Sequence, residues 1–315
     1  MKKNIDYSFA MGYIYGLSAK LLTKQKLEKL KNSKTIEEFL SLLKKEKYPV
    51  KGTIKYEEFE SIIEKNFWDI LKELQNFCNY AEEFEYIFCK SNFLNFKICL
   101  NQHFCNKKTR NFKIILSNMS QEEIKECIKS KEFSSLKQPY NKAFKNCFDV
   151  FLELQNKKQI DIKIDQEMYK TLLNLAKNDK FLTRRTKLEI TLKNINFLVR
   201  TLNSKKNITE KELDLCLIEN GVLDIKNEID LKTQNIKNLL LLYKKLTIAN
   251  INLNLNENTE TIEENILSEF DKSYLFETFN FTPIFNFINS FKKEIEILKE
   301  TMLKLSLKMK EVLLW

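Results

Sequence analysis

Residues that form turns are scarce in this chain of 315 residues, which contains 4 Gly and 3 Pro. Average usage would make the two together about 12% of a chain. Sandwiches, barrels, collagen-like chains and linker-rich chains need Gly or Pro at frequent turns, so the composition excludes them. The glycines, Gly12, Gly16, Gly52 and Gly221, form neither GxGxxG nor GxxxxGK, which excludes Rossmann and P-loop nucleotide sites. We therefore predict an all-α fold.

Groups that carry chemistry are also scarce. His103 is the single histidine, so general acid–base catalysis built on imidazole is not expected. The seven cysteines are odd in number, irregularly spaced and without a CxxC pair, which is typical of reduced, buried thiols and not of a zinc site. No apolar run reaches the length of about 18 residues that a membrane span requires. We predict no catalytic residues, no cofactor and no bound metal.

The net charge of +10 is unevenly distributed along the chain. Residues 1–105 carry 17 basic and 14 acidic side chains, residues 106–205 carry 22 and 11, and residues 206–315 carry 14 and 18. The middle segment is therefore basic (+11) and the last segment acidic (−4). A basic segment can face nucleic acid, an anionic membrane or an acidic protein. Four of the 53 basic residues are Arg, which disfavours sequence-specific DNA readout, because that readout relies on the Arg fork.

Helix starts are marked by Ser or Thr followed three residues later by Glu, a pattern typical of capping boxes. It occurs at Thr35, Ser120, Thr209 and Thr261. Thr282 followed by Pro283 predicts the start of the last helix. In that helix apolar residues recur at steps of three and four: Ile288, Phe291, Ile295, Leu298, Met302, Leu305, Met309 and Val312. This heptad seam predicts a long C-terminal helix that packs on an N-terminal helix near residues 7–21 or forms an intermolecular coiled coil.

An internal repeat recurs at a period near 100 residues. Residues 93–100 can be aligned with residues 192–199, and residues 291–298 fall in nearly the same register. The polar markers of the three copies are Asn95, Asn194 and Glu294, separated by 99 and 100 residues. Each marker lies at the border of an apolar helical face. A repeat period reports one structural unit, so we predict three pseudo-symmetric helical-bundle lobes, at residues 1–105, 106–205 and 206–315.

The opening of the chain, residues 7–22 (YSFAMGYIYGLSAKLL), resembles the N-terminus of the C-type subunit of the prokaryotic V/A-type rotary ATPase. That family is the counterpart of the eukaryotic V-ATPase d subunit. Its repeated motif, which runs from Asp through Asn to Arg, is similar to residues 191–200 and, more faintly, to residues 92–97. Thr191 and Asn92 stand where the family usually has Asp. The resemblance covers essentially the full length of the chain.

The resemblance implies a funnel-shaped, three-lobed helical protein with no catalytic site of its own. Such a protein lies on the cytoplasmic face of the membrane as a peripheral component of the ATPase. Its partners are the central-stalk subunits D and F and the membrane rotor ring of proteolipid subunits. It couples the rotation of stalk and ring during ATP-driven ion transport or ATP synthesis, and it binds no nucleic acid.

An alternative from the residues alone is a basic helical nucleic-acid-binding protein that uses residues 106–205. Both hypotheses need exposed basic residues, and loops carry binding more often than helix faces do. The candidate interface residues, expected in or near connections, are Lys107, Lys108, Arg110, Arg184 and Arg185. Arg200 follows an apolar run and is assigned either to an interlobe salt bridge or to the interface.

Overall fold

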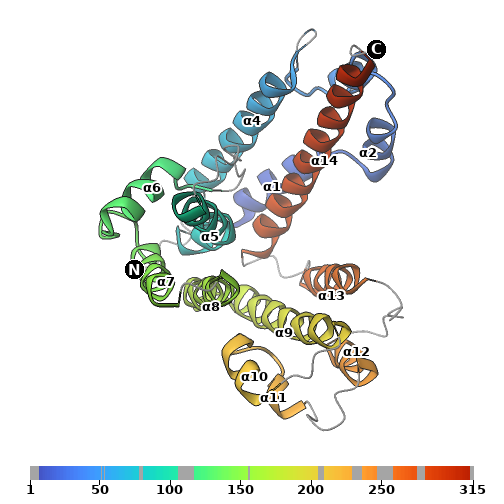
Figure 1. Ribbon diagram of the computed structural model, residues 1–315. Helices are drawn as coiled ribbons and strands as arrows, with labels where there is room; N and C mark the ends of the chain where they lie inside the picture. The colour runs from blue at the N-terminus through green and yellow to red at the C-terminus, as the bar shows by residue number, and fades with distance from the viewer. Residues whose placement is uncertain are drawn as a thin grey trace. The chain divides into compact units, whose positions relative to one another are not determined.

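The computed structural model describes residues 7–50, 52, 54–77, 81–105, 117–154, 157–204, 209–228, 236–246, 258–274 and 281–312. Within these residues every regular element is a helix (Figure 1). The helices are α1 (Tyr7–Ser18), α2 (Lys24–Lys31), α3 (Ile36–Lys45), α4 (Tyr56–Phe77), α5 (Ala81–Cys105), α6 (Gln121–Ser130), α7 (Tyr140–Leu154), α8 (Lys157–Ala176), α9 (Lys180–Asn203), α10 (Glu210–Cys216), α11 (Ile225–Glu228), α12 (Ile236–Lys245), α13 (Thr259–Ser273) and α14 (Thr282–Val312). The predicted all-α fold is confirmed. None of the helices in this part of the chain is both long enough and apolar enough to cross a bilayer.

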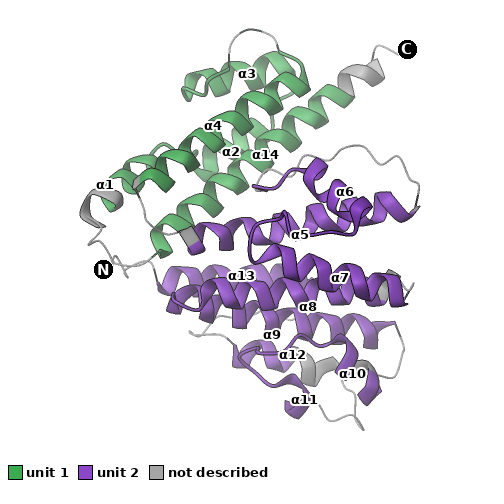
Figure 2. Cartoon of the chain, turned by 90° about the vertical axis from the view of Figure 1, so that its left-hand side faces the viewer, with its two compact units in different colours: residues 1–81, 278–315 green, residues 82–277 purple. Residues whose placement is uncertain are grey.

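The chain forms two compact units (Figure 2). Unit 1 contains residues 1–81 and 278–315, and unit 2 contains residues 82–277. The division into three lobes at residues 105 and 205 stays a prediction. Helix α5 ends at Cys105 and α9 ends at Asn203, so both predicted boundaries fall at or next to the end of a long helix.

Helix α14 is the central element of unit 1, where it contacts α1, α2, α3 and α4. The seam residues from Ile288 to Leu305 are at most 5% exposed, and Phe291 packs on Phe67 of α4 with ring centroids 5.2 Å apart. The expected mate, residues 7–21, supplies α1, but α4 with its 22 residues shares this role. The seam therefore packs inside unit 1. The side chains of Met309 and Val312 lie outside the described residues.

Unit 2 is built around α9, which contacts α8, α11, α12 and α13. Thirteen of the 24 residues of α9 are buried, as expected of a helix surrounded by others. A second part of this core joins α5 to α7 through aromatic rings. Phe144 stacks on Phe96 at 4.3 Å and meets Phe93 edge-on at 5.0 Å. All three rings are at most 1% exposed, which accounts for part of the phenylalanine content.

Side-chain caps fix several helix starts as the sequence indicates. Ser120 and Glu123 form a complete capping box at α6, and Thr35 caps α3 by accepting from the Glu38 N–H. The predicted start at Thr261 is wrong by two residues, since α13 begins at Thr259. Asn258 accepts a hydrogen bond from the Glu260 N–H at 3.2 Å, and Asn is at least as good a cap as Thr.

Truncating Phe144 to alanine should lower the free energy of unfolding by about 3–5 kcal/mol, because it empties the space between two buried rings. Chemical denaturation followed by circular dichroism measures this change. The matched control is Leu94→Ala, at a position of α5 that is 49% exposed, where a loss below about 1 kcal/mol is expected. Equal losses for the two variants would contradict the assignment of this aromatic core.

Candidate functional site: loop anchors and a buried ion-pair network

Helix α9 carries polar side chains at buried positions. They are Thr186, Glu189, Thr191, Asn194 and Asn196. A buried polar group without a hydrogen-bond partner costs free energy, and a buried charge costs more. The partners of these side chains therefore identify the contacts that organise unit 2. They divide into an ion-pair network toward one end of α9 and loop anchors near its middle.

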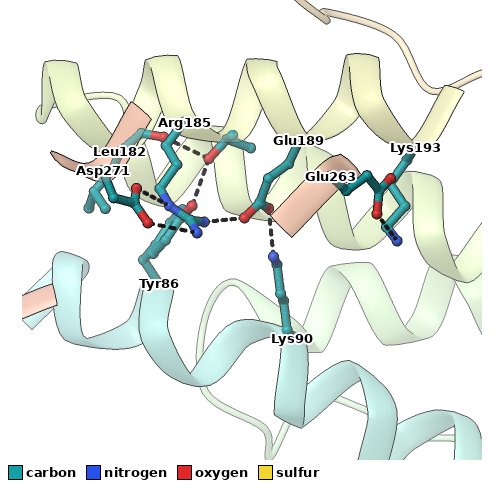
Figure 3. A network of polar contacts seen from close by, with 9 residues as sticks. Tyr86, Lys90, Leu182, Arg185, Glu189, Lys193, Glu263 and Asp271 are labelled. Atoms are coloured by element: carbon teal, nitrogen blue, oxygen red, sulfur yellow. Dashed lines mark hydrogen bonds and ion pairs between the residues drawn. The ribbon is translucent and has the colours of Figure 1, made fainter. Parts of the chain in front are cut away.

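The ion-pair network joins three helices around Arg185 (Figure 3). Its guanidinium donates to the Asp271 carboxylate of α13 through Nε at 2.8 Å and Nη2 at 3.3 Å. It also pairs with Glu189, one turn further along α9. The Glu189 carboxylate in turn accepts a hydrogen bond from Lys90 Nζ of α5 at 2.5 Å. A charge-assisted chain therefore links α5, α9 and α13 through side chains held in fixed positions.

The electrostatics of this network follow from burial opposed by pairing. Burial disfavours the charged guanidinium, but the carboxylates of Glu189 and Asp271 outweigh it and raise the pKa of Arg185. Burial also opposes ionisation of Glu189, yet Lys90 and Arg185 together lower the pKa of its carboxyl. Each charge is thus stabilised by an opposite one. Burial raises the pKa of the neighbouring Tyr86 hydroxyl, which shares a hydrogen bond of 2.9 Å with Thr186.

Asn194 anchors the chain that follows α10. Its Oδ1 accepts from the Ile218 N–H at 2.9 Å, and its Nδ2 donates to the Ile218 carbonyl at 2.8 Å. One turn earlier, Thr191 Oγ1 accepts from the Val222 N–H at 2.7 Å. A Cβ on Gly221 would lie 2.5 Å from that oxygen, so glycine is required for this close approach. Two side chains of α9 thereby fix the backbone of residues 218–222.

Asn95 makes comparable contacts from α5. Its Nδ2 donates to Ser117 Oγ at 2.7 Å and to the Met119 carbonyl at 3.4 Å, just before the capped start of α6. Its Oδ1 accepts from Gln121 Nε2 at 3.1 Å. Asn95 is 3% exposed and Asn194 is 4% exposed. Both marker residues thus hold backbone or side-chain groups of the loop that follows their own helix.

Glu294 is the third marker, and it anchors a loop near the other end of the chain. Its Oε2 accepts from the Leu22 N–H at 2.6 Å, immediately before the Thr23 cap of α2. Its Oε1 accepts from the Tyr48 hydroxyl. The carboxyl is 3% exposed, and burial, partly offset by the Leu22 N–H, raises its pKa to about 7. All three markers therefore hold loops, and the third uses an ionisable group.

Two hollows flank the segment after α10 in unit 2. One, of about 380 Å³, is lined by Asp165, Lys193 and Arg200 among others, and burial raises the pKa of the Asp165 carboxyl. The other, of about 370 Å³, lies beside Lys170 and Glu219. Within the described residues no group of three or more His, Cys, Asp and Glu could hold a metal ion. The polar groups in unit 2 thus hold helices and loops together.

The structure moves two of the predicted interface residues away from the positions expected for them. Arg184 and Arg185 lie inside α9, so the expectation of a connection there is wrong. The Arg185 side chain is 11% exposed and paired with two carboxylates. Arg184 donates from Nη1 to the Tyr274 hydroxyl at 2.7 Å. Reversing both charges would therefore damage the network and would not test docking.

The other predicted interface residues have different outcomes. Arg200 pairs with Glu260 of α13 at 2.8 Å, and both side chains are 64% exposed, so it makes the salt bridge that was one of its two assignments. Lys107, Lys108 and Arg110 lie outside the described residues.

Sequence reasoning missed Lys90, Glu189 and Asp271. Lys90 and Glu189 are 99 residues apart, the same separation as Asn95 and Asn194, so they occupy equivalent positions of the repeat. Opposite charges at equivalent positions were the available signal for this pair. Asp271 belongs to a different helix and has no comparable signal.

Comparison with known proteins adds one match. A family model described as "ATP synthase (C/AC39) subunit" matches residues 10–300, which is most of the chain. No curated protein matches the sequence.

Replacing Asp271 with alanine should lower the free energy of unfolding by about 2–3 kcal/mol, because Arg185 keeps only one of its two carboxylates. Glu260→Ala on the same helix is the matched control, since it removes an exposed partner of Arg200 and should cost less than about 1 kcal/mol. Urea denaturation of both variants at neutral pH measures the difference. A loss at position 271 no larger than at position 260 would show that the buried network does not stabilise unit 2.

Glu294 should make unit 1 less stable as the pH rises. Below its ordinary pKa of 4.5 the carboxyl is protonated in the folded and unfolded states alike, and the full stability is present. As the pH rises through about 7, that contribution, of the order of 3 kcal/mol, is lost, because ionisation is penalised only in the folded protein. Glu294→Gln should remove this part of the pH dependence, and Glu296→Gln, at an exposed position of α14, should keep it. Thermal melts between pH 5 and 8 would show identical slopes for all three proteins if the inference were wrong.

Proposed function

The chain belongs to the ATP synthase (C/AC39) subunit family, and from that membership we propose that it is the rotor adaptor of a V/A-type ATPase. It is a subunit of a rotary ATPase and is not itself an enzyme. In the proposed role it joins the central stalk, subunits D and F, to the membrane rotor ring of proteolipid subunits. It is peripheral, on the cytoplasmic face of the membrane, and transmits rotation during ATP-driven ion transport or ATP synthesis.

The observation that carries this proposal is the match of the family model over residues 10–300. The internal geometry supports it, because an adaptor that transmits torque has to resist deformation. In unit 2 the ion pairs of Arg185 and Glu189 tie α9 to α5 and α13. Asn95, Asn194 and Glu294 hold loops against long helices. Tightly packed helices with anchored loops deform little, which suits a mechanical part.

The nucleic-acid alternative loses support from the same geometry. It depends on basic side chains of residues 106–205 that reach phosphates. Arg185 is instead paired with carboxylates inside unit 2, and Arg184 is bonded to Tyr274. Lys90 and Lys193, on helices of the same unit, also pair with acidic side chains. Part of the positive charge is therefore neutralised within the fold.

The proposal predicts that removal of this chain uncouples the motor. A complex assembled without it should keep the ATPase activity of its catalytic head but lose ATP-driven ion transport, and addition of the purified chain should restore transport. ATP hydrolysis and ion uptake are measured together on reconstituted vesicles. Transport that is unchanged in the depleted complex would contradict the adaptor role, and association of the purified chain with DNA or RNA in place of the complex would favour the alternative.

A further inference from the structure

The segment between α10 and α11 is held more firmly than its short length requires. We call residues 217–224 the clamped loop. Gln166 of α8 donates from Nε2 to the carbonyls of Leu215 at 3.0 Å and Leu217 at 3.2 Å. Asn194 and Thr191 of α9 hold the backbone at Ile218 and Val222, as described above. Side chains from two helices thus fix the clamped loop and the end of α10.

The most exposed side chains of this fixed segment are apolar. Leu215, in the last turn of α10, is 61% exposed, and Val222 of the clamped loop is 54% exposed. They are the most exposed large apolar side chains in the described part of unit 2. The neighbouring Leu213, Leu217 and Ile225 are buried, at most 6% exposed. Buried apolar residues hold the segment in place, while Leu215 and Val222 project into solvent.

The two hollows described above lie on either side of this segment. The hollow of about 370 Å³ is bordered by Leu173 of α8 and by Leu217 and Glu219. The hollow of about 380 Å³ is bordered by Phe197 of α9 and by Cys216. Ile218 borders both. A ridge with exposed aliphatic side chains between two hollows is a shape that an interdigitating partner can cover.

The charge around the ridge selects the chemistry of the partner. Residues 209–228 contain two basic side chains, Lys211 and Lys226, and six acidic ones, Glu210, Glu212, Asp214, Glu219, Asp224 and Glu228. The local net charge is therefore −4, and Lys226 is itself paired with Asp214 at 2.5 Å. Glu219 and Asp224 are exposed. A partner that covers Leu215 and Val222 approaches an acidic rim and is favoured if it is basic.

Single exposed apolar side chains are common on protein surfaces and need no explanation. Here the pair is combined with hollows, an acidic rim and a backbone fixed before any partner arrives. Fixing a loop in advance reduces the conformational entropy lost on binding. We propose that Leu215, Val222 and the clamped loop form the docking surface for a basic segment of a partner protein in the complex, one that places aliphatic side chains against the hollows between its Lys or Arg residues. The existence of such a partner rests on the proposed function.

The test uses the full-length chain and the rotary complex depleted of it. The variant Leu215→Ser/Val222→Ser should weaken association with the depleted complex at least about tenfold, as loss of central apolar contacts does in other interfaces. Leu241→Ser, at a 48% exposed position of α12, is the matched control and should bind as wild type does. Circular dichroism melts of the three proteins should coincide. Glu219→Lys/Asp224→Lys should also weaken binding and flatten its dependence on salt, because surface charge attraction is screened.

A photo-cross-linker locates the partner. Leu215→p-benzoylphenylalanine, irradiated in the assembled complex and analysed by mass spectrometry, should give a cross-link to a Lys- or Arg-rich segment of another protein of the complex. A cross-link to a second copy of this chain, or to a segment without basic residues, would overturn the inference. Wild-type binding by the Leu215→Ser/Val222→Ser variant would overturn it too, and the adaptor role would stand because wild type still assembles. Failure of the wild-type chain to associate with the complex would instead contradict the proposed function.

Discussion

The structure depends on one constraint, that a polar group buried in the middle of a helix must find a hydrogen-bond partner. On α5, α9 and α14 this partner is a loop. Asn95 holds the chain before α6, Asn194 holds the chain after α10, and Glu294 holds the chain before α2. A loop held this way loses the freedom that loops usually have. One type of contact, used on three long helices, therefore determines how the connections of both units are fixed.

The buried charges of unit 2 obey the same constraint with larger energies. Arg185 and Glu189 are nearly removed from water, and each would be strongly unfavourable alone. Because Asp271 and Lys90 complete the set, the network requires α5, α9 and α13 to be in place together. The positive charge counted along residues 106–205 therefore does not measure the charge available to a partner, since part of it is neutralised inside the fold.

Local chemistry made much of the fold predictable. The scarcity of Gly and Pro indicated helices, and the caps at Thr35 and Ser120 are those of the structure. The spacing of the marker residues pointed to positions that hold loops, although not to the groups that they hold. The Arg185–Asp271 pair, separated by 86 residues, has no local signal. Arg184 and Arg185 resembled a solvated connection because adjacent charges usually are one, and only the distant Asp271 makes burial of Arg185 favourable.

The order of the segments in unit 1 has a consequence for how the protein is made. Helices α1 to α4 come from residues before position 82, whereas α14, the helix on which they pack, is the last helix of the chain. During synthesis from the N-terminus, these four helices leave the ribosome without the surface that covers Phe67 and its neighbours, and all of unit 2 is translated before that surface appears. Chaperones that bind exposed apolar helices would therefore meet this chain early and release it late, and a nascent chain truncated before α14 would be recognised as unfinished.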